Sequence, residues 1–244
     1  MQSDNINDNW KKDRICVALD LDDKENIINI VDELAGYVGF FKLNFAFTKY
    51  GPKLIEMIKK RGGKVFLDLK FHDIPNTVEG YARMATSLGV DIFNVHASGG
   101  SLMMKSALKG AKEVAAEKNI KRPIVTAVTL LTSINLETMN SELNISGTVE
   151  NQVLSLARMT QDAGLDGIVC SGQELEKIKP ELKKDFFYIT PGIRTSPAKD
   201  DQKRVYTPKK AIENGSSLIV VGRDIINADN RAEAVRKLYD EIEF

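Results

Sequence analysis

The stretch Phe66-Leu-Asp-Leu-Lys-Phe-His-Asp-Ile-Pro-Asn-Thr77 joins an apolar segment to a charged loop and then to a threonine suited to capping a helix. Its apolar part predicts a strand over Val65–Lys70. Successive side chains of a strand point to opposite faces, so Asp68 and Lys70 share one face. A buried carboxylate is costly alone, but an ammonium two residues away can partner it. Asp73 adds a second carboxylate beyond the strand, so two acids flank one lysine.

Strand-like and helix-like segments alternate along the whole chain. The predicted strands are Ile15–Asp20, Phe40–Asn44, Val65–Lys70, Asp91–His96, Ile124–Leu130, Gly167–Cys170, Phe186–Thr190 and Leu218–Val221. The predicted helices are Glu25–Leu34, Thr48–Arg61, Thr77–Leu88, Ser101–Lys118, Val149–Asp162, Gln173–Ile178, Pro208–Asn214 and Ala232–Ile242, several of them followed by glycine. Eight such pairs in 244 residues predict an α/β fold of the (β/α)₈ TIM-barrel type, whose usual length is about 250 residues.

A doubly wound open sheet shows the same alternation, but it favours a G-x-G-x-x-G after an early strand, and the sequence has none. No linker rich in Pro, Gly or Ser divides the chain. We therefore expect an N-terminal tail over residues 1–13 and a single barrel domain over 14–244. The segment Thr132–Gly147 is long enough for a short helix near Leu136–Met139. The long polar segment Pro191–Thr207 has the profile of a mobile lid.

Composition excludes several classes of function. Lys+Arg and Asp+Glu number 34 each, and zero formal net charge argues against a general binder of nucleic acid or of membrane surfaces. Cys16 and Cys170 lie in apolar runs and are predicted to be small buried hydrophobes rather than a disulfide or metal ligands. No apolar run reaches a membrane span, and the polar start Met1–Asp13 does not resemble a signal peptide. We expect a cytoplasmic protein.

The active site of a barrel forms where its strands end, and polar residues gather at these ends. The first five strands bring Asp20, Lys42, Asn44, Asp68, Lys70, Asp73, Asn94, His96, Thr132 and Ser133, and the last two bring Arg194, Gly222 and Arg223. Gly222 allows backbone N–H groups to approach a ligand, and Arg223 offers a bidentate fork, which predicts an anion site together with Arg194. His96 is interpreted as a hydrogen-bonding residue rather than a catalytic base.

A metal site is an alternative use of the three acids Asp20, Asp68 and Asp73. Lys42 and Lys70 would lie among these carboxylates and supply their counter-charge. We therefore expect no metal.

The segment Asp68–Thr77 closely resembles the signature D-x-K-x-x-D-I-P-x-T of the orotidine 5′-phosphate decarboxylase family. Further matches follow in the family's order, at Val17-Ala-Leu-Asp20, Phe41-Lys-Leu-Asn44, Val95-His-Ala97, Leu131-Thr-Ser133, Pro191-Gly-Ile-Arg194 and Val221-Gly-Arg223. The D-x-K-x-x-D part alone is shared with sugar-phosphate decarboxylases and synthases of similar barrels. The I-P-N-T continuation and the distal arginine motif favour the orotidine 5′-phosphate decarboxylases.

The resemblance implies decarboxylation of orotidine 5′-phosphate to UMP, in pyrimidine biosynthesis, without a cofactor. A carbanion at C6 of the pyrimidine has no conjugated electron sink, so preorganised charge must stabilise the transition state. By resemblance, Lys70 protonates C6, Asp68 and Asp73 keep that lysine charged, and Lys42 completes the array.

Binding roles are also implied by the resemblance. Asp20, Lys42 and Thr77 are expected to contact the ribose, Thr132 (or, as a substitute, Ser133) the pyrimidine, and Gly222, Arg223, Arg194 and Gln202 the phosphate. The resemblance further implies a homodimer with shared active sites, in which Asp73 and Thr77 enter the site of the partner subunit. A metal-dependent sugar-phosphate enzyme and a catalytically silent nucleotide-binding module are the alternatives.

Overall fold

The structure, a computed structural model, describes residues 9–194 and 206–242. Eight parallel strands close into a barrel in the order β1 to β8, and β1 pairs with both β2 and β8. The strands are β1 (Ile15–Ala18), β2 (Phe40–Leu43), β3 (Lys64–Phe71), β4 (Ile92–His96), β5 (Ile124–Val128), β6 (Gly167–Val169), β7 (Phe187–Thr190) and β8 (Leu218–Val221). The (β/α)₈ barrel is confirmed, and the open sheet is excluded by the closing β1–β8 pair.

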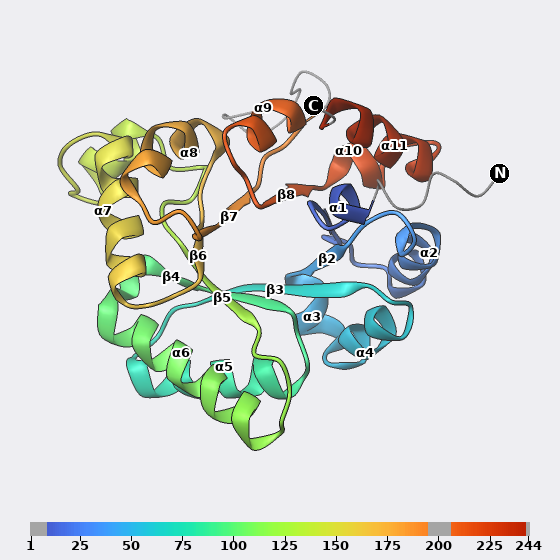
Figure 1. Cartoon of the computed structure of the whole chain (residues 1–244), viewed down its shortest axis with the longest axis horizontal. Helices are drawn as coiled ribbons and strands as arrows, with labels where there is room; N and C mark the ends of the chain where they lie inside the picture. The colour runs from blue at the N-terminus through green and yellow to red at the C-terminus, as the bar shows by residue number, and fades with distance from the viewer. Residues whose placement is uncertain (1–8, 195–205, 243–244) are drawn as a thin grey trace.

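Helices surround the strands on the outside of the barrel (Figure 1). They are α1 (Asn9–Lys12), α2 (Lys24–Leu34), α3 (Phe45–Tyr50), α4 (Lys53–Lys60), α5 (Pro75–Ser87), α6 (Gly100–Glu117), α7 (Val149–Asp162), α8 (Gly172–Ile178), α9 (Pro208–Glu213), α10 (Arg223–Ile226) and α11 (Arg231–Glu241). Short 3₁₀ turns occupy Ala97–Gly99 and Lys179–Glu181, and a π-helical turn occupies Thr138–Glu142. Among the described residues, no helix is long and apolar enough to cross a membrane.

Two hydrophobic layers follow from the alternation of side chains along each strand. Phe66, Ile92 and Val128 belong to a cluster inside the barrel. Leu67 and Phe93 belong to the larger cluster that packs the strands against the helices. The two cysteines are free and buried, as predicted, and burial raises the pKa of both thiols. A polar side chain that points into the barrel is therefore surrounded by apolar residues, unless it lies near the end of a strand where the cavity opens.

The predicted helix Thr48–Arg61 is wrong in one respect, because the structure divides it into α3 and α4. Gly51 between them has φ 68°, and Pro52 follows. A left-handed residue ends the first helix, and proline is well suited to the start of the second. The Gly-Pro pair was a visible signal of this break.

The helix-capping role predicted for Thr77 is also wrong. Helix α5 begins at Pro75, and Ile74 occupies the position before it. Proline is favourable in the first turn because its missing N–H is one that a helix leaves unpaired there. Thr77 consequently lies within the first turn of α5, the helix that follows β3.

Candidate active site

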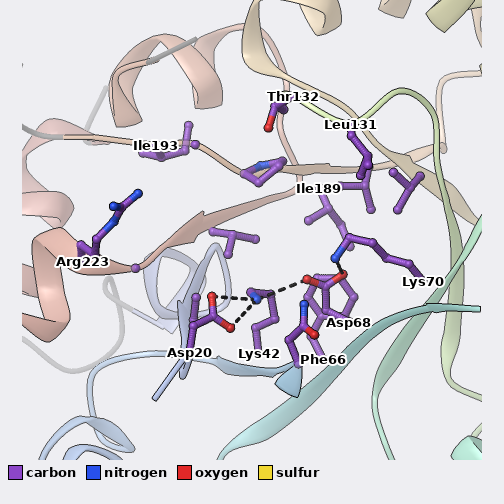
Figure 2. Close-up of a pocket in the computed structure, with 18 of the residues that line it drawn as sticks. Asp20, Lys42, Phe66, Asp68, Lys70, Leu131, Thr132, Ile189, Ile193 and Arg223 are labelled. Atoms are coloured by element: carbon purple, nitrogen blue, oxygen red, sulfur yellow. Dashed lines mark hydrogen bonds and ion pairs between the residues drawn. The ribbon is translucent and has the colours of Figure 1, made fainter. Parts of the chain in front are cut away.

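A cavity of about 670 Å³ opens where the strands of the barrel end. Residues from β2, β3 and the loops after β1, β5, β7 and β8 line it, and Figure 2 shows the main ones. The volume lies within the range of roughly 300–1,000 Å³ that is typical of small-molecule sites. Its lining includes most of the polar residues that the sequence placed at strand ends: Asp20, Lys42, Asn44, Asp68, Lys70, Thr132, Arg194, Gly222 and Arg223.

One side of the cavity carries a row of alternating charges. Lys42 Nζ lies 3.0 Å from an oxygen of Asp20 and 3.2 Å from Oδ2 of Asp68. Lys70 Nζ donates to Oδ1 of Asp68 at 2.7 Å. Figure 2 shows these contacts as one continuous chain of dashed lines. Each oxygen of Asp68 therefore contacts a different lysine.

Burial differs sharply along this row of charges. The side chains of Lys42 and Asp68 are 9% and 10% exposed, whereas that of Lys70 is 28% exposed. Burial works against the charge on Lys42, but the attraction of Asp68 and Asp20 outweighs it and raises the pKa of the lysine. Lys42 is therefore a fixed ammonium at neutral pH. Lys70 is the more accessible of the two lysines and faces the space in which a ligand would lie (Figure 2).

The position of Lys70 depends on an irregularity in β3. Leu67 pairs with Phe93 of β4, but the next pair joins Phe71 to Val95, so β3 has two extra residues in this interval. Lys70 adopts φ 50°, in the left-handed region. For a residue other than glycine this conformation is strained and persists only where the surroundings impose it.

The opposite end of the cavity can hold an anion. Gly222 precedes α10, whose first residue is Arg223. In Figure 2 the Arg223 guanidinium lies across the cavity from Lys70. Arg194 is 8% exposed and contacts Asp224 at 2.5 Å, so a carboxylate orients it beside the same loop. Arginine side chains and a backbone N–H at a glycine are groups that bind phosphate.

An apolar surface with one polar side chain completes the cavity. Leu131, Ile189 and Ile193 line it, and Thr132 points inward from the loop after β5 (Figure 2). A flat heterocycle can lie against such a surface while a hydroxyl hydrogen-bonds its edge. Ser133, the weaker alternative to Thr132, is exposed and is not one of the lining residues.

Three predicted site residues are not brought into this cavity by the described chain. Asp73 is exposed, with Oδ1 accepting a hydrogen bond from the Ile74 N–H at 2.6 Å, and Thr77 is half-buried on α5. Neither residue lines the cavity. Gln202 lies outside the described residues, as does most of the predicted lid Pro191–Thr207.

The metal alternative is disfavoured by the position of Lys42. Its ammonium lies between Asp20 and Asp68, at 3.0 and 3.2 Å, where a bridging cation would have to bind. Among the described residues, no group of three or more His, Cys, Asp or Glu side chains is spaced to hold a metal ion.

Sequence reasoning missed the roles of two polar residues. Asn94 of β4 is fully buried and its Nδ2 donates to Asp68 Oδ1 at 2.7 Å. Asp224 contacts Arg194. An asparagine in the middle of an otherwise apolar strand was a signal for the first. No signal in the sequence connected Arg194 with Asp224, because Arg194 follows β7 whereas Asp224 lies in α10.

A histidine pair lies beside the row of charges. The rings of His72 and His96 are 5.3 Å apart. Burial lowers the pKa of His96 from its ordinary value of 6.5, and the nearby His72 and Lys70 lower it further. His96 is therefore neutral at pH 7.

This lowered pKa predicts acid sensitivity. Below about pH 6.5 the unfolded chain takes up a proton at His96 that the folded chain resists, so stability falls as the pH drops from 6.5 through the folded pKa. The variant H96N should show a smaller drop in melting temperature between pH 7.5 and pH 5 than the unmodified chain. The control H72N should retain most of the drop, since burial of His96 is the largest cause. An equal drop in H96N and the unmodified chain would contradict the assignment.

Comparison with known proteins identifies the family. Residues 13–238 match the model of the orotidine 5′-phosphate decarboxylase / HUMPS family. The orotidine 5′-phosphate decarboxylase of Moorella thermoacetica is 44% identical over 95% of this chain and 93% of its own. That of Carboxydothermus hydrogenoformans is 46% identical over 95% of this chain and 96% of its own.

A solved structure is similar over the same extent. The crystal structure of orotidine 5′-phosphate decarboxylase from Lactobacillus acidophilus superposes with a TM-score of 0.83 at 39% identity, covering 94% of this chain and 99% of that one. The family match over residues 13–238 includes all eight strands and the loops that carry the charged row and the anion site. The chain belongs to the orotidine 5′-phosphate decarboxylase / HUMPS family.

Proposed function

We propose that this chain decarboxylates orotidine 5′-phosphate to UMP in de novo pyrimidine biosynthesis, without a cofactor. The observation that carries the proposal is the row Asp20–Lys42–Asp68–Lys70 in the same cavity as Arg223. Family membership and relatives named for this activity support it.

The cavity accommodates the three parts of such a nucleotide. The phosphate binds Arg223 and the Gly222 N–H, with Arg194 oriented nearby by Asp224. The ribose hydroxyls contact Asp20 and Lys42, which lie between the anion site and Lys70 (Figure 2). The pyrimidine lies against the apolar surface and accepts or donates a hydrogen bond at Thr132. This orientation places its C6 carboxylate toward Lys70.

The reaction requires groups that stabilise the negative charge developing on C6, because the pyrimidine offers no conjugated electron sink for it. When the bond between C6 and the carboxylate carbon breaks, its electron pair stays on C6 and CO₂ leaves. The Lys70 ammonium stabilises this negative charge and then donates a proton to C6, forming UMP. The neutral lysine regains a proton from water. Because Asp68 and Lys42 hold the surrounding charges in place beforehand, no reorganisation is needed as the carbanion develops.

We further propose a homodimer in which Asp73 and Thr77 enter the active site of the partner subunit. Both residues follow β3 and neither lines the cavity of its own barrel. Exposed apolar side chains accompany them, with Ile74 67% exposed and Tyr81 38% exposed. An apolar surface of this kind favours a protein partner. In an isologous dimer each subunit then supplies the last carboxylate of the other subunit's array.

The cytoplasmic location stays a prediction. It rests on two buried, free cysteines.

The activity is tested by the loss of absorbance of orotidine 5′-phosphate in the presence of EDTA. We expect turnover with no metal added. K70A should lower kcat by about 10²–10⁴-fold, the range of general acid catalysis, or by more. K60A is the matched control, because the Lys60 side chain is 71% exposed on α4 and its removal should leave kcat unchanged. Activity that disappears in EDTA and returns with Mg²⁺ would favour a metal-dependent sugar-phosphate enzyme instead. Binding of UMP without turnover would indicate a silent nucleotide-binding module.

The shared site is tested by mixing two inactive variants. K70A and D73A are each expected to be inactive, but subunit exchange should form hybrid dimers in which one site contains Lys70 from one chain and Asp73 from the other. About half of the dimers in an equal, fully exchanged mixture are hybrids with one complete site, so about a quarter of the normal activity should return. If subunits exchange and no activity returns, the shared site is refuted.

A further inference from the structure

We infer that Asn94 is a positioning residue that holds Asp68 and Lys70 in their working geometry. The inference rests on the proposed function, because it concerns the lysine that protonates C6. Asn94 is fully buried and does not line the cavity, and its side chain hydrogen-bonds to the Lys70 backbone and to the Asp68 carboxylate. Its action on the reaction is therefore through them.

The need for such a residue arises from the irregularity in β3. Between the pairs Leu67↔Phe93 and Phe71↔Val95, three residues of β3 face a single residue of β4. That single residue is Asn94. The backbone N–H of Lys70 donates to Asn94 Oδ1 at 2.8 Å. A side chain thus replaces the backbone partner that a regular parallel ladder would provide.

The second contact of Asn94 is with the carboxylate of Asp68. Asn94 Nδ2 donates to Asp68 Oδ1 at 2.7 Å, the same oxygen that accepts from Lys70 Nζ. Only one orientation of the amide satisfies both contacts, because a carboxylate cannot donate and a backbone N–H cannot accept. Asn94 thereby fixes two things at once: the left-handed backbone at Lys70 and the rotation of the Asp68 carboxylate.

Asn94 lies among residues that fill the inside of the barrel, where apolar side chains also pack. Ile92 and Val128 point into the same interior cluster. Thr126, opposite Asn94 on β5, is also fully buried, and within the described part of the chain its hydroxyl has no hydrogen-bond partner. Burying an amide is costly unless each polar atom is bonded. Asn94 is bonded at both ends, and both bonds lead to the residues proposed to be catalytic.

One variant removes both hydrogen bonds, and another removes only the bond to Asp68. N94L keeps the number and branching of the side-chain heavy atoms, at a somewhat larger volume, and removes both bonds. N94D keeps an acceptor for the Lys70 N–H but sets a second carboxylate against Asp68 in place of a donor. T126V is the matched control, because it changes a buried polar residue of the same layer that touches neither Asp68 nor Lys70 through a hydrogen bond. Replacing its unpaired hydroxyl by a methyl group is expected to leave stability and activity unchanged or slightly improved.

The expected result is a fall in kcat of about 10²-fold for N94L and at least as much for N94D, the size of effect that a misplacement near 1 Å produces. KM for orotidine 5′-phosphate should change little, since the groups proposed to bind phosphate, ribose and pyrimidine remain. A residue with only a structural role would lower the melting temperature and leave the kcat of the folded protein intact. Normal kcat in N94L, or in N94D where N94L does not fold, would overturn the inference.

A readout without turnover separates this inference from the proposed function. In a crystal structure of N94L or N94D, Lys70 should leave the left-handed region or its Nζ should move away from Asp68 Oδ1. Unchanged positions of both residues would refute the role of Asn94, whatever the enzyme's substrate. Conversely, an unmodified chain that does not turn over orotidine 5′-phosphate would refute the proposed function, and this structural comparison would still decide the role of Asn94.

Discussion

The buried carboxylate of Asp68 is the interaction on which the rest of the site depends. One of its oxygens contacts Lys42, and the other receives hydrogen bonds from Lys70 and Asn94. A buried carboxylate is tolerable only when it is paired and hydrogen-bonded, and removing one partner of such a group typically costs about 3–5 kcal/mol. The fold accepts this arrangement because the barrel places strands β2, β3 and β4 side by side, and these strands carry Lys42, the pair Asp68 and Lys70, and Asn94, respectively.

Burial also makes the arrangement useful. Apolar residues fill the barrel below Asp68, and the cavity lies above it. Fixed charges in such surroundings act more strongly on a developing carbanion than the same charges in water. In the proposed function, phosphate bound at Arg223, at the other end of the cavity, contributes binding energy that positions the pyrimidine against Lys70 without direct contact with the reacting carbon.

The sequence was sufficient for the fold and for most of the cavity, for physical reasons that individual residues illustrate. Strand alternation correctly placed Asp68 and Leu67 on opposite faces of β3, because the period of side chains along a strand is a local property. The break at Gly51 was visible but overridden by the longer helical pattern. The left-handed backbone of Lys70 and its bond to Asn94 were not predictable, since both depend on the register between two strands. The roles proposed for Asp73 and Thr77 require a second subunit, because neither residue lines the cavity of its own barrel.

The most direct test of the central claim follows the reverse of the proton transfer. If Lys70 donates a proton to C6, then by microscopic reversibility it also removes the C6 hydrogen of bound UMP. We expect the unmodified enzyme to exchange this hydrogen for deuterium in D₂O, observed by proton NMR, and K70A to show no exchange above the uncatalysed rate. Exchange at an equal rate in K70A would contradict the account.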